Sequence, residues 1–116
     1  MRLLAAATTA AAHFDELDVI ATPTVMVSPH VLAEDSGSEQ FWARNRRIVH
    51  NLAPVNYLGL CAATLPVGLD RIGMPVGLQL IAKGGDDERL VAVACAVEGV
   101  LGTPREIIGA PPLCRG

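Results

Sequence analysis

The feature that most constrains this chain is a pair of apolar runs joined by a short, glycine-containing connector. The runs cover residues 62 to 66 and 76 to 82. Neither run alternates polar with apolar residues, which is typical of strands that are covered on both faces. We therefore predict two neighbouring strands inside a sheet.

The segment after the second run predicts an amphipathic helix over residues 87 to 101. Its apolar face carries Leu90, Val93, Ala94, Val97 and Leu101 at helical spacing. Asp86 has the position of an N-cap, and Gly102 followed by Pro104 is a stop signal. A helix with such a stripe needs a sheet beneath it, so the pattern predicts an α/β fold.

The first half of the chain predicts two more helices and a short strand. Apolar spacing over residues 3 to 14 favours a helix over the alternative interpretation of this alanine-rich start, a weak signal peptide. A strand is predicted at residues 18 to 21, with a stop at Thr22-Pro23-Thr24 because proline lacks an N–H. The segment from Ser36 to Glu39 has capping-box spacing, which predicts a helix from about residue 40 that Pro54 ends or kinks.

Length and charge limit the classes of partner. The chain has 116 residues, the length of one small domain, and a formal net charge of −3. This charge gives no general attraction to nucleic acid or to an anionic membrane, and no apolar run is long enough to span a bilayer. Cys61, Cys95 and Cys114 form no C-x-x-C pattern, which argues against a disulfide framework and a zinc site and favours a cytoplasmic location.

The residues that could perform nucleophilic catalysis are few. Serine occurs only at positions 28, 36 and 38, and none has a Gly-x-Ser-x-Gly setting. Capping and turns explain all three serines, and the single lysine, Lys83, has no sequence relation to Ser28 that would place the two within hydrogen-bond reach. We therefore predict no catalytic residue within this chain.

Ligand-binding motifs are equally scarce. His13, His30 and His50 lack metal-ligand spacing, so no metal and no cofactor are expected. The basic cluster at residues 44, 46 and 47 is explained by a solvated helix face. Gly84-Gly85 precedes a helix, but the acidic residues 86 to 88 would repel a phosphate there.

Three separate segments resemble one known family. The order "FDELDVIATPT", then "NLAPVNYLGLCAATLPVGLDRIGMPVGLQLIA", then an acidic start to an alanine-rich helix is similar to the C-terminal part of the amidase signature family. The most specific pieces are residues 18 to 24, 56 to 66 and 73 to 79. The resemblance implies that residues 1–116 are the C-terminal portion of an amidase domain, with a mixed β-sheet covered by α-helices.

The resemblance also implies an activity. Members of this family hydrolyse carboxamides through a serine activated by a second serine, in a cis peptide, and a lysine. Those residues lie earlier in the family's chain, so we expect a truncated or split amidase that takes a small amide substrate only together with the N-terminal part. The implied substrate-binding residues are Thr22, Thr24, His50 and Asn51, although turns and helix-end hydrogen bonds explain each of them too.

Two departures from the family pattern bear on its subgroups. Cys61 stands where many members have proline, and Val49 stands where glutamine-using transamidation subunits have aspartate. A hydrolase of small amides or urea derivatives is therefore ranked above a glutamyl-tRNA amidotransferase A-type subunit. The remaining alternative is a non-catalytic module that uses the scaffold for binding or for self-association, which exposed apolar surface would favour.

Overall fold

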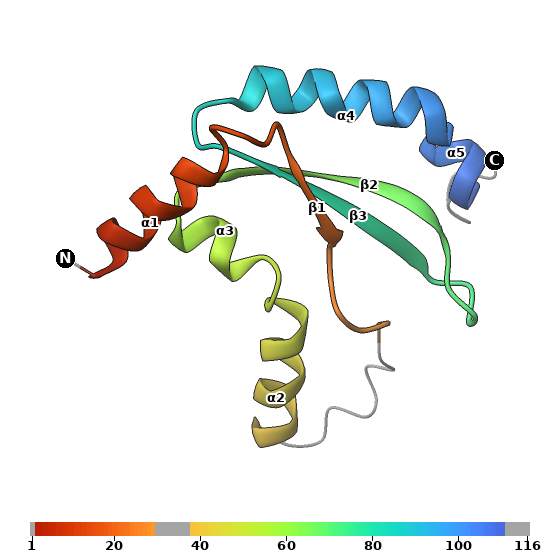
Figure 1. Ribbon diagram of the computed structural model, residues 1–116. Coiled ribbons are helices and arrows are strands. Elements are labelled where there is room, and N and C mark those ends of the chain that lie inside the picture. The colour runs from red at the N-terminus through yellow and green to blue at the C-terminus, as the bar shows by residue number, and fades with distance from the viewer. Residues whose placement is uncertain (1, 30–37, 111–116) are drawn as a thin grey trace.

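The structure is a small sheet with helices on both of its faces (Figure 1). This computed structural model describes residues 2–29 and 38–110. The elements in chain order are α1 (Arg2–His13), β1 (Ile20–Pro23), α2 (Ser38–Ile48), α3 (Ala53–Tyr57), β2 (Cys61–Leu69), β3 (Pro75–Ala82), α4 (Asp87–Leu101) and α5 (Pro104–Ile108). Helix α4 lies over one face of the sheet, and α3 lies on the opposite side.

The three strands are arranged in the order β1-β3-β2, and both pairs are antiparallel. The prediction of two neighbouring strands is confirmed. Among the described strands, however, the sheet is purely antiparallel and not mixed. For β2 and β3 the reason lies in the connector, since a turn this short can join only antiparallel strands, whereas a parallel pair needs a crossover of about a dozen residues or more.

The core lies between α4 and the sheet. Its buried side chains are Leu80, Ala82, Leu90 and Ala94, and partly buried residues of β2 and β3 pack around them. This arrangement confirms the predicted helix over residues 87 to 101 and its packing on the sheet. The hydrophobic effect explains this packing, because Leu90 and Ala94 of the α4 stripe are buried against the sheet, although Leu101 at the end of the stripe stays exposed.

The prediction that both strands are covered on both faces holds only for part of β3. Residues 79 to 82 are buried, so this half of β3 is covered on each side. In β2, by contrast, Ala62 and Thr64 are exposed while Cys61 and Ala63 are half-buried. Strand β3 lies in the centre of the sheet and β2 lies at its edge, which accounts for the difference.

Two prolines play roles that the sequence interpretation assigned wrongly. Strand β1 includes Pro23 and does not stop before it. The N–H of Thr24 bonds to the carbonyl oxygen of Gly77 at 2.9 Å, so strand alternation turns the backbone of Pro23 away from β3, where no N–H is needed. Helix α2 ends at Ile48, and Pro54 lies in the first turn of α3, where proline is favoured.

The ends of the later helices follow local signals. Asp86 is the N-cap residue of α4, although its side chain makes no capping hydrogen bond, and Gly102 ends the helix with a φ of 101°. Helix α5 was not predicted. A capping box of Thr103 and Glu106 starts it, with Pro104 in its first turn. The proposed capping box at Ser36 lies outside the described residues.

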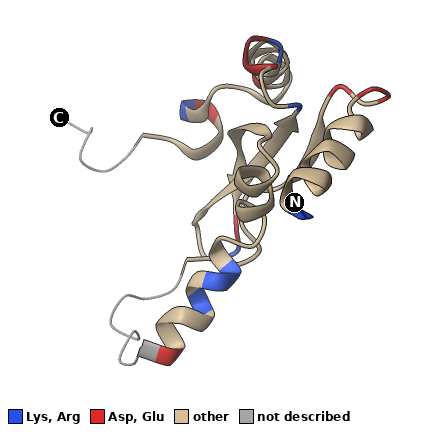
Figure 2. Ribbon diagram, turned by 90° about the vertical axis from the view of Figure 1, so that its left-hand side faces the viewer, with Lys and Arg blue, Asp and Glu red and all other residues tan. Residues whose placement is uncertain are grey.

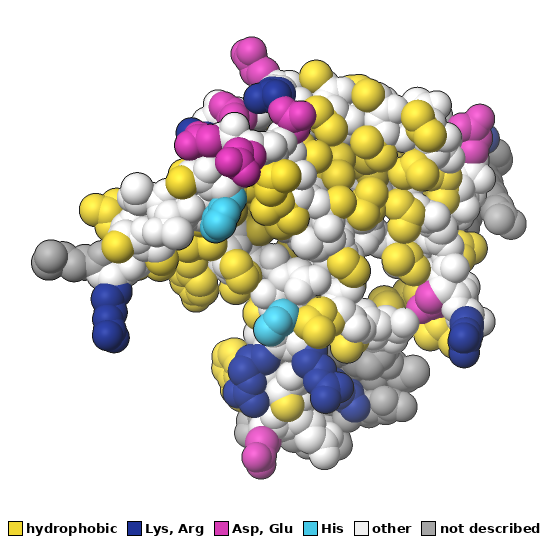
Figure 3. Space-filling view, viewed as in Figure 1, with side chains coloured by type: hydrophobic (Ala, Val, Ile, Leu, Met, Phe, Trp, Pro, Cys, Tyr) yellow, Lys and Arg dark blue, Asp and Glu magenta, His cyan; other side chains and the backbone are white. Residues whose placement is uncertain are grey.

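Large apolar side chains remain exposed on several elements (Figure 3). Leu4 on α1 is 75% exposed and Val100 on α4 is 86% exposed. Exposed apolar side chains of this kind favour association. Within residues 2–29 and 38–110, no helix has the length and hydropathy that crossing a membrane requires.

Candidate functional site

A row of three polar side chains crosses the sheet on the face opposite α4. Thr22 of β1 lies opposite Gln79 of β3, and Thr64 of β2 lies opposite Gln79 from the other side. Directly opposed residues in an antiparallel pair project from the same face, so these three side chains stand next to one another. We call Thr22, Gln79 and Thr64 the polar row.

Gln79 is the buried centre of the polar row. Its exposed fraction is 1%. Within the described part of the chain, neither amide atom of Gln79 has a hydrogen-bond partner, and neither has the hydroxyl oxygen of Thr22. A buried polar group without a partner costs about 1–3 kcal/mol of stability, so its retention at this position needs an explanation.

Thr24 extends the polar row by one step. Its hydroxyl donates to the hydroxyl oxygen of Thr64 at 3.3 Å. Gly77 lies beside this contact, and a β-carbon on residue 77 would stand 2.6 Å from Oγ1 of Thr24. Because residue 77 is glycine, there is room at this place for the side chains of Thr24 and Thr64.

Asn51 connects the turn between α2 and α3 to β1. Its Nδ2 donates to the carbonyl oxygen of Pro23 at 2.7 Å. This bond holds the turn next to Thr22 and Thr24, so three of the four residues expected to bind substrate lie along one strand end. His50 is exposed in the same turn, and no hydrogen bond of the described residues joins it to the other three. A role for any of the four in substrate binding stays a prediction.

The sequence interpretation did not single out Thr64 or Gln79. Gln79 is the only side-chain amide in the apolar run from 76 to 82, and that isolation was an available signal. Thr64 gave no comparable signal, because its position beside Gln79 depends on the register between β2 and β3. The polar row is a product of strand pairing.

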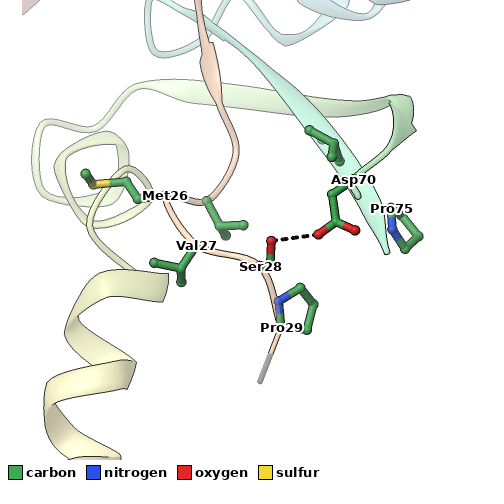
Figure 4. A pocket seen from close by; sticks show the side chains of 9 residues that line it. Met26, Val27, Ser28, Pro29, Asp70 and Pro75 are labelled. Carbon is green, nitrogen blue, oxygen red and sulfur yellow. Dashed lines mark hydrogen bonds between the residues drawn. The ribbon is translucent and has the colours of Figure 1, made fainter. Parts of the chain in front are cut away.

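Ser28 belongs to a different site, a cavity of about 210 Å³ at the turn between β2 and β3 (Figure 4). Its hydroxyl donates to Oδ2 of Asp70 at 2.6 Å. The other carboxylate oxygen of Asp70 accepts the N–H groups of Ile72 and Met74, both at 2.9 Å. These hydrogen bonds lower the pKa of Asp70, and the bond from Ser28 has the largest effect. The carboxylate is therefore a poor base, and its bonds fix the turn between β2 and β3.

Lys83 lies at the other end of β3 from the Ser28 cavity. Its Nζ is 3.5 Å from Oδ1 of Asp15. Strand β3 has 8 residues, so its two ends are about 25 Å apart at the rise of a β-strand. Ser28 and Lys83 therefore do not form a serine-lysine pair.

The remaining reactive side chains offer little chemistry. The thiol of Cys61 donates to the carbonyl oxygen of Lys83 at 3.1 Å, and its pKa is raised by burial and by the nearby carboxylate of Asp87. No group of three or more potential metal ligands occurs in residues 2–29 and 38–110. The basic residues of α2 lie far from the acidic start of α4 (Figure 2).

Comparison with known proteins gives consistent relatives. The chain is 42% identical over 104 residues to the 2-amino-5-chloromuconic acid deaminase of Comamonas testosteroni, covering 90% of this chain and 22% of that protein. It is 38% identical over 92 residues to a fatty acid amide hydrolase of Medicago truncatula, covering 77% and 15%. It is 37% identical over 88 residues to the A-type subunit of the glutamyl-tRNA(Gln) amidotransferase of Parvibaculum lavamentivorans, covering 76% and 17%.

The matched region is a small part of each relative but most of this chain. The chain spans at most 22% of the length of these three proteins. A profile described as Amidase matches residues 2–91. The chain therefore belongs to the amidase family.

Proposed function

We propose that this chain is the C-terminal portion of an amidohydrolase that cleaves carboxamide C–N bonds. In this proposal, the serine, cis-serine and lysine of the reaction come from a polypeptide segment outside residues 1–116. Family membership supports the reaction class. The small share of each relative that the chain spans supports the need for a further segment.

The observation that carries this proposal is the polar row with its unpartnered groups. Gln79 presents one amide donor group and one carbonyl acceptor, and Thr22 adds a hydroxyl that can donate or accept. A carboxamide carries the complementary set, an N–H donor and a C=O acceptor. Both amide atoms of Gln79 are buried in this fold, so the proposal requires that joining the further segment opens the polar row to the substrate. A buried polar group without a partner needs an explanation, and a functional role is the one proposed for this row.

The side chains of this chain do not replace the serine, cis-serine and lysine of the proposed reaction. Amide hydrolysis needs an acceleration of at least about a million-fold, which requires an activated nucleophile and donors for the developing oxyanion. Ser28 donates its proton to a carboxylate whose lowered pKa makes it unable to act as an effective base. We therefore assign Ser28 a structural role and assign Thr22, Thr24, His50 and Asn51 to the substrate side.

One residue, Val49, indicates the substrate class that we propose within the family. Val49, in the turn before Asn51, lacks the carboxylate that glutamine-using enzymes are expected to carry there. This favours a hydrolase of small amides or urea derivatives over a glutamine-using transamidation subunit. The chain is 37% identical to the amidotransferase subunit, so transamidation is the alternative reaction within the family.

The proposal is tested by complementation. The purified chain is assayed for ammonia release from a panel of simple amides, alone and with a co-expressed N-terminal portion of the Comamonas relative, where the family resemblance places the two serines and the lysine. We expect activity only in the mixture, and a loss of at least about ten-fold in Asn51→Ala. Ser28→Ala serves as the matched control and should retain the activity of the mixture. Turnover by the lone chain that disappears in Ser28→Ala would overturn the proposal.

A non-catalytic binding or self-association module is the second candidate function. The exposed apolar side chains, such as Leu4 and Val100, favour it. The same assay separates the two candidates. A mixture that assembles, as shown by size-exclusion chromatography, but releases no ammonia from any amide would favour the module.

A further inference from the structure

The two outer strands of the sheet differ in how their free edges are closed. Because Thr24 bonds to Gly77, alternate residues of β1 point their backbone groups away from β3, and these are Ala21 and Pro23. Pro23 has no N–H to offer, and its carbonyl oxygen already accepts the amide of Asn51. Among the described residues, only Ala21 of β1 keeps an outward donor and acceptor without a partner, so β1 offers almost no edge for another strand.

The free edge of β2 is open over a longer stretch. The backbone groups of β3 alternate between its two neighbours, so those of Leu78 and Leu80 face β2 and those of their β2 partners Leu65 and Ala63 face β3. Ala62, Thr64 and Pro66 consequently face outward. Among the described residues, no backbone hydrogen bond outside the strand ladders involves Ala62 or Thr64. Both residues are exposed.

We propose that β2 pairs with β2 of a second copy of this chain, antiparallel, about a two-fold axis at Ala63. In this register Ala62 of each copy lies opposite Thr64 of its partner. Each opposed pair exchanges two N–H···O bonds, so the contact forms about four hydrogen bonds. The pairing joins the two sheets into one of six strands.

A second copy fits this edge because the edge is self-complementary. The outward positions are separated by one residue, so a two-fold rotation brings every free donor onto a free acceptor. Their side chains are small and uncharged, which removes the repulsion by which charged edge residues prevent such pairing. Pro66, which lacks an N–H, ends the open stretch and fixes the register.

The contact is expected to be weak. A pair of short strands buries less than the roughly 1,200 Å² of standard stable interfaces. We therefore expect a weak, transient dimer, with a dissociation constant of about 10 μM to 1 mM. Sedimentation velocity over this concentration range should show a monomer–dimer equilibrium. The amide hydrogens of Ala62 and Thr64, followed by NMR, should exchange more slowly as the concentration rises, and that of Ala21 should not.

Two matched proline variants identify the edge. Ala62→Pro removes an outward N–H of β2 and should raise the dissociation constant at least about ten-fold, without loss of a bond to β3. Ala21→Pro removes the corresponding N–H of β1 and should dimerise like the wild type. Circular dichroism melting shows whether each variant folds. A monomer at every concentration, concentration-independent exchange at Ala62 and Thr64, or a dimer that only Ala21→Pro disrupts would each overturn the proposal.

Discussion

Gly84 lies so close to the backbone of Gly59 that a β-carbon on residue 84 would stand 1.9 Å from the Gly59 carbonyl oxygen. Gly59 precedes β2 and Gly84 follows β3, so this approach closes the open end of the β2–β3 pair. The thiol of Cys61 bonds to the carbonyl oxygen of Lys83 at the same place. Backbone packs on backbone here, which leaves no flexible side chain to move aside.

Gly84→Ala should therefore destabilise the fold by at least about 2 kcal/mol, because one of the two loops must shift. Gly99→Ala is the matched control, since a β-carbon there meets nothing within 4 Å and alanine is the better helix former. We expect that control to be neutral or slightly stabilising. Urea unfolding followed by circular dichroism measures both, and equal stability of the two variants would contradict the close approach.

Gly77→Ala should destabilise through a contact with Thr24. The new β-carbon would stand 2.6 Å from Oγ1 of Thr24 and 2.9 Å from Cγ2 of Thr64. The cost should fall by about 1 kcal/mol when Thr24→Ala is already present, because one of the two collisions is then absent. A double-mutant cycle with urea unfolding measures this coupling. Additive effects would show that Thr24 does not limit the space at residue 77.

Gln79→Met should stabilise the isolated chain. It replaces a buried amide that has no partner in the described residues with an apolar side chain of similar length, a gain of about 1–3 kcal/mol. Gln40→Met, at an exposed position of α2, is the control and should change little. Thermal unfolding measures both variants. Destabilisation by Gln79→Met would mean that an internal water or another group satisfies the amide.

The same substitution should have the opposite effect on activity. If the polar row binds the substrate amide, Gln79→Met should raise stability and lower ammonia release in the complemented enzyme. Stabilising changes at functional positions often reduce activity in this way. Unchanged activity in a stabilised variant would remove Gln79 from the substrate side.

Asp70 should make stability sensitive to acid. Its pKa in the folded state is lowered, chiefly by the hydroxyl of Ser28, below the value of about 3.9 that an unfolded chain shows. Its contribution is therefore present above about pH 4 and is lost as the pH falls through the lower folded pKa. Melting temperatures measured between about pH 2 and 6 should depend less on pH in Asp70→Asn than in the wild type. Ser28→Ala should show an intermediate dependence, and identical profiles in all three would exclude the Ser28–Asp70 bond as the cause.

The strongly patterned elements of this fold were predictable. Strands β2 and β3 and helix α4 follow from apolar runs and from the helical spacing of residues such as Leu90 and Ala94. Helix α1 follows from the same kind of pattern. These features depend on neighbours in sequence, and the burial that stabilises them acts on the pattern itself.

Proline positions were harder to interpret. Pro23 lies within a strand and Pro54 starts a helix, although proline stops both kinds of element in other contexts. Whether its missing N–H matters depends on which way the backbone faces, and β1 is an edge strand only because β3 lies on one side of it. Strand pairing decides which strand lies at an edge and which of its residues face outward, so the local sequence does not predict either.

The candidate site was predictable only in part. The resemblance pointed to Thr22, Thr24 and Asn51, which the structure places along one strand end. Thr64 and the burial of Gln79 depend on the register of β2 and β3 across the sheet. The sequence by itself therefore determined the strands, the main helix and the family, whereas the tertiary structure decided which polar groups meet. Strand register decides this because a shift of one residue in the pairing of a strand would turn the side chains of that strand to the other face of the sheet.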